Sequence, residues 1–274
     1  MNKKIVIIGH GFVGKAVDYG FSHPNVKKHI IDPIYGVDLK ADDDALSSAD
    51  AVFVCVPTPM KDNGEIDISI LDPVMRDTFK RVGFNTTIVI KSTVTPQAIK
   101  TYDVASIVYN PEFLTERSAN EQFIDPVFHI LGGHPKNTHV IADLYNNYSL
   151  VNPTKTFHTT MEEASFIKYA INSFLALKVT FFNQLYDAVG ETDANFTRII
   201  NAVGSDPRIG HSHTKVPGFD GKQGFGGACF PKDVSALTKS TNMFTILEEC
   251  VIINNQYRNK YEKDERELTQ NIQY

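Results

Sequence analysis

Short apolar runs alternate with amphipathic stretches over the first 157 residues of the chain. The apolar runs cover residues 3–8, 28–31, 51–56, 87–90, 106–108 and 128–131. Residues 69–80, between two of these runs, have the spacing of a helix with one buried face. Continuous apolar strands that alternate with helices are typical of a parallel sheet buried on both faces. The pattern predicts an α/β fold here, with a doubly wound, Rossmann-type domain at residues 1–157.

The pattern changes after about residue 158, where the strand signal ends. Thr160 and Glu163 have the spacing of a capping box, in which each side chain bonds to the other residue's backbone amide. A long helix is predicted from this box to about Val189, and only helices are predicted after Asp233. Residues 158–274 are therefore expected to form an all-helical domain built on one long central helix.

The first apolar run ends in a GxGxxG turn made by Gly9, Gly11 and Gly14. In dinucleotide-binding proteins the first glycine makes the tight turn, the second admits a pyrophosphate, and the third lets the next helix pack on the strand. The second run ends in Asp32, at the distance expected of an acid that binds a ribose hydroxyl. An acid there repels a 2′-phosphate, so NAD is predicted rather than NADP. The predicted cofactor-binding turn also includes Phe12 and Val13.

Three polar loops follow predicted strands, at residues 57–59, 91–93 and 110–112. In open α/β sheets ligands bind beyond the carboxyl ends of the strands. These loops are therefore the candidate wall of a site. Thr58 and Thr93 each have a hydroxyl that can face a cofactor or substrate, although threonine is also an ordinary turn residue after a strand.

Residues 224–233 place Cys229 on a glycine-rich turn next to a lysine and an aspartate. A nearby cation or a helix N-terminus favours the nucleophilic thiolate, and Pro231 suits the first turn of a helix. Cys250 instead lies within an apolar helical pattern, as a core cysteine does. Cys229 is therefore predicted to take part in chemistry.

Lys168 and Asn172 lie four residues apart in the predicted long helix, among apolar residues. This spacing puts both side chains on one face of the helix. Two interpretations stay open from the residues alone. Lys168 is a functional cation, or it is a lysine whose stem covers apolar surface while its ammonium reaches water.

Composition narrows the function classes. The net charge of −5 offers no footprint for nucleic acid, and no apolar stretch has the length of a membrane span. Three scattered cysteines cannot complete a disulfide framework, which favours a reducing, cytoplasmic location. His211 and His213 have no acid or cysteine nearby to complete a ligand set, so no metal is predicted. The charged run 262–267 is expected to be a solvated end of a helix that begins near Met243.

Six segments, in the same order, resemble the nucleotide-sugar 6-dehydrogenase family, whose familiar members are the UDP-glucose and GDP-mannose dehydrogenases. The segments are residues 9–14, 54–59, 91–94, 110–116, 168–172 and 224–233. The segments are spread along the chain, so the resemblance covers nearly the whole of it. The glutamate-bearing segment and the cysteine segment together are highly specific to this family.

The resemblance implies a four-electron oxidation of the primary alcohol of a nucleotide sugar to a uronic acid, with two NAD consumed. UDP-glucose is the expected substrate and UDP-glucuronate the product, an activity that serves polysaccharide biosynthesis. On the matching positions Cys229 forms a thiohemiacetal and then a thioester. Lys168 and Asn172 provide an oxyanion site. Asp233 and Lys168 are both candidates for the base of the first oxidation.

The glutamate segment adds further expected site residues. By resemblance, Glu112 or Glu116 activates the water that hydrolyses the thioester, and Thr93 is implicated with them. Spacing alone would indicate only a charged helix face for the two glutamates. The resemblance implies cofactor contacts from Val56, Pro57, Thr58, Thr93, Glu116 and Lys232. It implies substrate contacts from Glu112, Phe113, Leu114, Lys168, Asn172, Arg208, Phe225, Gly226 and Gly227.

The resemblance also implies how the chain assembles and how its length compares with that of family members. Arg208 matches an arginine that reaches the substrate of the neighbouring subunit, and the long helix is expected to pair two subunits in a homodimer. Family members normally continue into a third, nucleotide-gripping domain, whereas this chain ends at Tyr274, so a short form is expected. Residues 211–223 form a longer connection than is usual, with residues 217–221 expected as an extra loop over the site.

Two alternative functions stay open. A two-electron, NAD-dependent hydroxyacid dehydrogenase would share the dinucleotide-binding unit and the long helix, but would need no thiol nucleophile. A non-catalytic NAD-binding partner of a full-length enzyme would need none of the catalytic residues. Cys229 counts against the first alternative, and the retained set of Cys229, Lys168, Asn172 and Asp233 counts against the second.

Overall fold

The computed structural model describes residues 2–39, 43–115 and 118–274. The chain forms two compact units. The first comprises Met1–Thr58 and Asp67–Lys168, and the second comprises Pro59–Ile66 and Tyr169–Tyr274. The boundary lies inside the long helix α7 (Met161–Gly190), which continues through it without interruption.

The first unit is built on a seven-stranded sheet with the order β2-β1-β3-β4-β5-β6-β7. Every pairing is parallel except that of β5 with β6. Strands β1 and β3 pair along their buried residues, with Ile5 opposite Ala51 and Ile8 opposite Val54. The strands are β1 (Lys3–Ile8), β2 (Val26–Ile31), β3 (Ala51–Val54), β4 (Thr87–Ile90), β5 (Ile107–Tyr109), β6 (Phe128–Gly133) and β7 (Lys155–Thr159).

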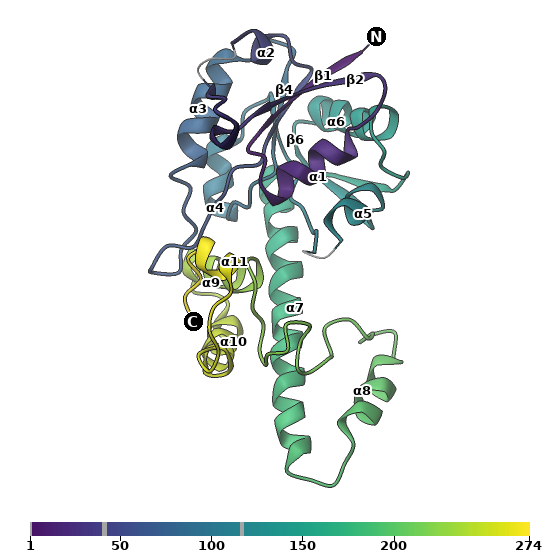
Figure 1. The fold of residues 1–274 in the computed structure, drawn as a ribbon, viewed down its shortest axis with the longest axis vertical. Helices are drawn as coiled ribbons and strands as arrows, with labels where there is room; N and C mark the ends of the chain where they lie inside the picture. Colours follow the sequence, from purple (N-terminus) through teal and green to yellow (C-terminus); the bar gives the residue numbers. More distant parts are fainter. Residues whose placement is uncertain (1, 40–42, 116–117) are drawn as a thin grey trace. The chain divides into compact units, whose positions relative to one another are not determined.

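Helices cover both faces of this sheet, as Figure 1 shows. Along β1, Ile5 and Ile7 face one core and Val6 and Ile8 face the other, because successive side chains of a strand point to opposite faces. The helices on the first face are α1 (Phe12–Gly20), α5 (Ala119–Ile124) and α6 (Pro135–Tyr148). Those on the second are α2 (Asp43–Ser47), α3 (Leu71–Arg81) and α4 (Pro96–Ile99). The predicted doubly wound fold is confirmed.

Two features of the sheet were not predicted. Strand β7 has the sequence Lys-Thr-Phe-His-Thr and lies at the edge of the sheet, so it lacks the apolar run of a buried strand. Strand β6 runs antiparallel to β5, with Val108 opposite Gly133. A fully parallel sheet was therefore a wrong expectation in this detail, because an apolar run does not record its direction in the sheet.

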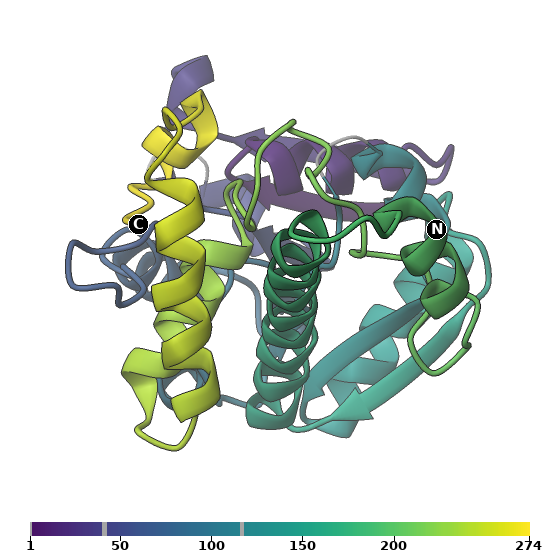
Figure 2. The same cartoon turned by 90° about the horizontal axis from the view of Figure 1, so that it is seen from below.

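The second unit is helical, around the C-terminal part of α7. Its other helices are α8 (Phe196–Gly204), α9 (Phe230–Ser240), α10 (Thr245–Arg258) and α11 (Glu265–Thr269). In Figures 1 and 2, α8 lies on one side of α7, and α9 and α10 lie on the other. The start of α7 is the predicted capping box, since Thr160 N donates to Glu163 Oε2 and Glu163 N donates to Thr160 Oγ1. No helix among the described residues is long and apolar enough to cross a membrane.

The charged run at residues 262–267 differs from its prediction. Helix α10 ends at Arg258, and a separate helix, α11, begins after Asp264, which caps it. Glu267 is fully buried and forms an ion pair with Arg258. The expectation of a solvated helix end was therefore wrong at Glu267, because a buried cation from α10 stabilises this charge.

Candidate functional site

The GxGxxG turn connects β1 to α1, and the space around its glycines explains each of them. Gly9 has φ +87°, a conformation that favours glycine. A Cβ on Gly14 would lie 1.9 Å from the carbonyl oxygen of Gly9. Any larger residue at position 14 would therefore prevent α1 from packing against the turn. Gly11, in contrast, is exposed and would meet nothing within 4 Å. The fold therefore requires Gly9 and Gly14, whereas the open space at Gly11 fits the approach of a pyrophosphate.

Asp32 follows β2 and is held by two backbone amides. Its Oδ2 accepts from His10 N at 2.6 Å, and its Oδ1 accepts from Ile34 N at 2.9 Å. These bonds orient the carboxylate and leave further lone pairs for a ribose diol. His10 is tied to the same corner, since its Nδ1 lies 2.9 Å from Tyr35 Oη. The residues present thus fit the adenosine half of a dinucleotide.

Loops after β3 and β4 lie next to each other at the carboxyl edge of the sheet. Ser92 Oγ donates to the carbonyl oxygen of Val56 at 2.6 Å, which joins the two loops. Thr58 is buried, Thr93 is half-buried and Pro57 is exposed. The structure therefore brings the predicted loop residues together at one edge, while their contacts with a cofactor stay predictions.

A buried polar network lies beneath this edge, and the sequence alone did not single it out. Lys91 Nζ donates to Asn110 Oδ1 at 3.0 Å, and Tyr145 Oη donates to the same oxygen at 2.7 Å. Burial lowers the pKa of Lys91 to about 8, although the charge of Glu112 opposes this shift. Asn110 Nδ2 donates to the carbonyl oxygen of Ile130. The network fixes Asn110 at the start of the glutamate segment.

Lys168, on α7, is directed at that segment. Only 3% of the residue is exposed, so the interpretation of a lysine whose ammonium reaches water was wrong. Its Nζ donates to the carbonyl oxygen of Glu112 and lies 5.1 Å from the centre of the Phe113 ring. The Glu112 carboxylate accepts from Leu114 N at 2.6 Å. Glu116 lies outside the described residues.

In the second unit Cys229 is the N-cap residue of α9 and is half-buried. The N-terminus of a helix stabilises negative charge and thus favours a thiolate. One turn later on α9, Asp233 is buried and accepts two bonds: Asn172 Nδ2 donates to its Oδ2 and Lys232 Nζ to its Oδ1, each at 2.6 Å. Asn172 is one turn along α7 from Lys168, so α7 carries both predicted oxyanion donors on one face.

Lys232 and Arg208 have partners within the chain. Lys232 is buried against Asp233, and its predicted contact with the cofactor stays a prediction. Arg208 is exposed and pairs with Asp206 at 2.6 Å. Hydrogen bonds from Arg208 lower the pKa of Asp206. The predicted contact of Arg208 with a neighbouring subunit's substrate also stays a prediction.

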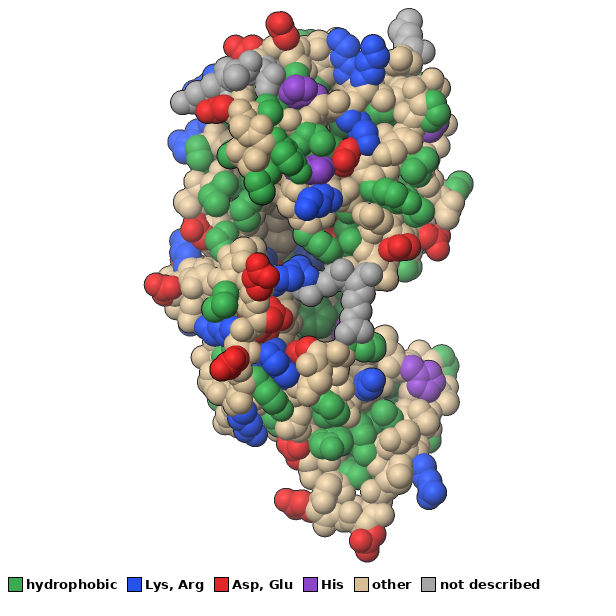
Figure 3. Space-filling view, in the orientation of Figure 1, with side chains coloured by type: hydrophobic (Ala, Val, Ile, Leu, Met, Phe, Trp, Pro, Cys, Tyr) green, Lys and Arg blue, Asp and Glu red, His purple; other side chains and the backbone are tan. Residues whose placement is uncertain are grey.

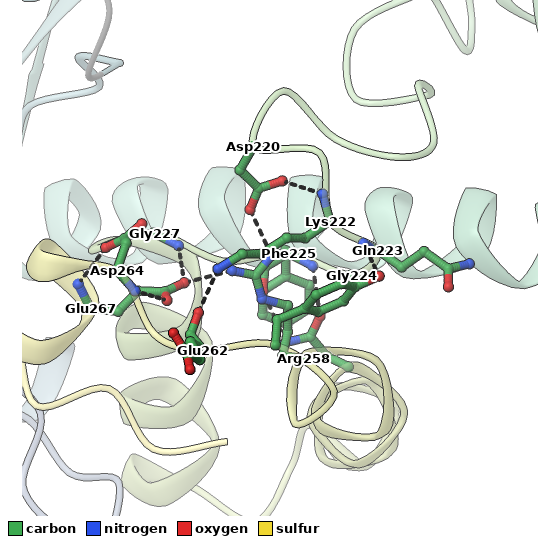
Figure 4. Close-up of polar contacts among 12 residues, drawn as sticks. Asp220, Lys222, Gln223, Gly224, Phe225, Gly227, Arg258, Glu262, Asp264 and Glu267 are labelled. Atoms are coloured by element: carbon green, nitrogen blue, oxygen red, sulfur yellow. Dashed lines mark hydrogen bonds and ion pairs between the residues drawn. The ribbon is translucent and has the colours of Figure 1, made fainter.

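The loop that precedes Cys229, residues 224–227, is held by side chains from three helices; we call it the glycine loop. Gly224 N donates to Asn183 Oδ1 on α7 at 3.0 Å. Asn254 on α10 clamps Phe225, with its Oδ1 accepting from Phe225 N and its Nδ2 donating to Phe225 O. Gly227 N donates to Glu267 Oε1 on α11 at 2.9 Å. Figure 4 shows part of this arrangement.

The sequence patterns did not predict that Asn183, Asn254 and Glu267 hold this loop. The available signal was spacing: Asn183 lies eleven residues after Asn172, about three helical turns. Polar residues that recur at such intervals in a buried helix share one face and have a common target. No comparable local signal identifies Glu267.

The remaining cysteines are core residues. Cys250 is buried, and its Sγ lies 3.2 Å from Thr180 Oγ1, as expected of a packed residue. Burial raises the pKa of Cys55 to about 12, which keeps it a neutral thiol. Within the described part of the chain, no group of three or more His, Cys, Asp or Glu residues could hold a metal ion.

Comparison with known proteins matches both parts of the chain to one family. Residues 23–149 match the NAD binding domain of the UDP-glucose/GDP-mannose dehydrogenase family, and residues 162–256 match its central domain. The first match identifies NAD as the cofactor. A UDP-glucose 6-dehydrogenase from Rickettsia conorii is 36% identical over an alignment of 203 residues that covers 70% of this chain and 45% of that protein.

Two further similarities extend over more of the chain. A UDP-glucose 6-dehydrogenase from Rickettsia bellii is 30% identical over 94% of this chain and 58% of its own length. The solved structure of a UDP-glucose dehydrogenase from Pyrobaculum islandicum is 25% identical and superposes with a TM-score of 0.78, covering 95% of this chain and 69% of that one. The chain spans about half the length of the curated relatives it matches.

Proposed function

Since this chain belongs to the UDP-glucose/GDP-mannose dehydrogenase family, we propose that it oxidises the primary alcohol of a nucleotide-activated hexose to a carboxylate. The observation that carries the proposal is Cys229 at the N-terminus of α9, one turn before a buried Asp233 that is bonded to Asn172. A dehydrogenase that stops at the aldehyde needs no thiol in such a place. A thiol nucleophile permits a second oxidation at the same carbon.

In the first oxidation the substrate's hydroxyl proton passes to Asp233 or to Lys168. When bound, NAD accepts the hydride in each oxidation. The bonds from Asn172 and Lys232 orient the Asp233 carboxylate, whose oxygens can accept a proton or orient a water. The product of this step is the aldehyde.

In the second half of the reaction the Cys229 thiolate adds to the aldehyde carbon, and the new carbon–sulfur bond gives a thiohemiacetal. Negative charge gathers on the substrate oxygen during this addition, where Lys168 and the Asn172 amide stabilise it. Loss of a hydride and a proton converts the thiohemiacetal to a thioester. Water, activated by Glu112, then cleaves the carbon–sulfur bond, which releases the carboxylate and restores the thiolate.

UDP-glucose is the substrate that we propose, with UDP-glucuronate as the product. The names of the relatives from the two Rickettsia species support this choice, as does that of the solved structure from Pyrobaculum. The roles assigned to Glu112, Thr93 and the cofactor-binding loops follow the same resemblance. Glu116, which we also propose as a base, lies outside the described residues.

We expect the purified chain to form two NADH for each uronate when it is incubated with UDP-glucose and NAD. The reason is that alcohol and acid differ by four electrons, and each NAD removes two. Absorbance at 340 nm counts NADH, and mass spectrometry counts the acid. One NADH per substrate molecule, with no acid formed, would instead identify a two-electron dehydrogenase. NAD binding without any turnover would indicate a non-catalytic partner.

We also propose that the chain forms a homodimer through α7. Exposed phenylalanines recur along this helix at Phe166, Phe174 and Phe181, a spacing close to the seven-residue repeat of helices that pair. Phe174 is 66% exposed and Phe181 is 59% exposed. Figure 3 shows hydrophobic side chains gathered at the surface in the region of α7 and α8. A second copy of α7 is the occupant that matches such a stripe.

Replacing both Phe174 and Phe181 with glutamate should convert a dimer to a monomer. A homodimer buries both phenylalanines from each chain, each side chain contributes up to about 1.5–3 kcal/mol when fully buried, and buried charges would oppose association further. Light scattering coupled to size exclusion measures the mass, and the monomer has 30.6 kDa. Phe84→Glu, at a fully exposed position outside α7, is the matched control. A wild-type chain that is monomeric at micromolar concentration would contradict the proposal.

A further inference from the structure

A fully buried ion pair joins the end of α10 to α11. Arg258 is 1% exposed, Glu267 is not exposed at all, and Arg258 Nη2 lies 2.7 Å from Glu267 Oε1. Arg258 Nη1 also lies 2.7 Å from Asp220 Oδ2. Removing a charge pair from water costs several kcal/mol, so such pairs are weak sources of stability. The residues around this pair indicate another role, which is to hold the neighbouring loop in one conformation.

Glu267 is the centre of this cluster. Its Oε1 accepts from Gly227 N and Tyr274 Oη as well as from Arg258, and its Oε2 accepts from Asp264 N. Burial tends to raise the pKa of Glu267, but the bonds from Tyr274, Gly227 and Asp264 and the charge of Arg258 outweigh it and lower the pKa. The carboxylate is therefore charged at neutral pH and its lone pairs are directed at the glycine loop and the C-terminal residues. Figure 4 shows Arg258 and Glu267 beside Gly227.

The glycine loop is shaped to this ion pair. A Cβ on Gly226 would lie 2.1 Å from Arg258 Nη2 and 2.6 Å from Glu267 Oε1. No side chain larger than hydrogen fits there while the ion pair keeps its place. The sequence of the loop and the position of the ion pair therefore depend on each other.

The same C-terminal residues contact a second segment of this unit, Pro59–Ile66. Met60 N donates to Gln270 O at 3.0 Å, and Asn271 Nδ2 donates to Met60 O and to Asp62 Oδ1, each at 3.0 Å. This segment packs on α9, since a Cβ on Gly64 would lie 2.3 Å from Ser235 Oγ. Residues 264–274 thus contact the loop before Cys229 and a segment packed on the helix that follows Cys229.

We propose that Arg258 and Glu267 are positioning residues for the Cys229 motif, with residues 264–274 acting as a clasp that keeps the glycine loop in its substrate-binding conformation. The proposal rests on the proposed function for the identity of the substrate. Both residues lie beyond the part that matches the family's central domain, which ends at residue 256. Ordering one backbone residue costs about 1–2 kcal/mol, and glycine loses the most freedom, so a loop with three glycines needs fixed partners. These partners are Asn183 and Glu267, which accept from the Gly224 and Gly227 amides, and Asn254, which both accepts from and donates to Phe225.

The test compares Glu267→Gln and Tyr274→Phe with Glu265→Gln, a matched control at an exposed position of the same helix. Glu267→Gln keeps an oxygen that can accept from Gly227 N but removes the charge that Arg258 requires. Tyr274→Phe removes one bond to Glu267 and is the milder variant. In the full-length chain, the rate of alkylation by iodoacetamide is measured at each cysteine by mass spectrometry.

We expect alkylation of Cys229 to become about tenfold faster in Glu267→Gln and about threefold faster in Tyr274→Phe, because a released loop exposes the thiol more often. Cys55 and Cys250 are buried and serve as internal references, since general unfolding would accelerate them as well. In steady-state assays with UDP-glucose, KM should rise about tenfold while kcat falls less, because the loop contacts substrate in the proposed function. Glu265→Gln should match the wild type in every readout.

The outcomes separate the clasp from the proposed function. If the chain oxidises no UDP-glucose, the thiol rates still test the clasp. Cys229 rates within twofold of wild type in both variants, with the two reference thiols protected, would overturn the proposal. Acceleration of all three thiols to the same extent in Tyr274→Phe would overturn it too, because it would mark a general stabilising role. If Glu267→Gln does not fold, Tyr274→Phe alone decides.

Discussion

Replacing Cys229 with serine is expected to abolish formation of uronate, with a fall of at least about a thousandfold. A serine hydroxyl at the N-terminus of α9 occupies the same place as the thiol. It is almost entirely protonated at neutral pH and is a weak nucleophile, however, whereas a thiol is a few per cent thiolate and the thiolate is intrinsically very nucleophilic. The covalent adduct with the aldehyde would not form, so the second oxidation would have no substrate. Product analysis by mass spectrometry after incubation with UDP-glucose and NAD measures the loss.

The matched control is Cys250→Ala. Cys250 is buried on α10 and contacts Thr180, and neither residue has a role in the proposed mechanism, so its replacement leaves a small cavity without removing a reacting group. We expect a loss of stability of about 1 kcal/mol and normal uronate formation. Uronate produced by Cys229→Ser at the wild-type rate would show that the covalent mechanism is wrong.

Asp233→Asn should reduce both stability and activity. The variant leaves the Lys232 ammonium buried without its counter-charge, since the two groups lie 2.6 Å apart with little exposure of either. Breaking a buried ion pair on one side costs about 3–5 kcal/mol. Loss of a group that accepts or relays a proton lowers the rate by about 10²–10⁴-fold. Urea denaturation measures the free energy of unfolding, and kcat/KM for UDP-glucose measures the activity.

A double variant separates the two effects. In Asp233→Asn combined with Lys232→Met, neither position of this pair carries a charge, so most of the lost stability should return. The activity should not return, because the amide cannot accept the substrate's proton. If the double variant regained activity together with stability, Asp233 would be a structural partner of Lys232 and the base would have to be another group, with Lys168 the next candidate.

Features that depend on residues close together in the chain were determined by the sequence. The GxGxxG turn, Asp32 after the second strand and the capping box of Thr160 and Glu163 all act through neighbours within a few residues or one supersecondary unit. The apolar runs determined that the first unit is doubly wound, because strands buried on both faces need continuous apolar residues. The position of Cys229 at a helix start followed from Pro231 and the glycines before it.

Features that depend on contacts between distant residues were decided only by the tertiary structure. The position of β7 at the sheet edge and the antiparallel direction of β6 depend on which strand lies alongside each of them. The local pattern of apolar and polar residues indicates neither. Whether a charge is solvated depends in the same way on its partner. Glu267 looks like a surface residue in a charged run until Arg258, nine residues earlier, is placed against it.

The candidate site shows the same difference between local sequence features and contacts of distant residues. The sequence by itself singled out the residues that we propose as nucleophile, acid and amide, because they belong to short motifs around Cys229, Asp233 and Asn172. Only the tertiary structure decided what holds them: the Lys91 network under the glutamate segment, and the contacts of Asn254 and Glu267 with the glycine loop. The physical reason is that reactivity is a property of a side chain, whereas its placement depends on burial and on hydrogen bonds from residues remote in the chain.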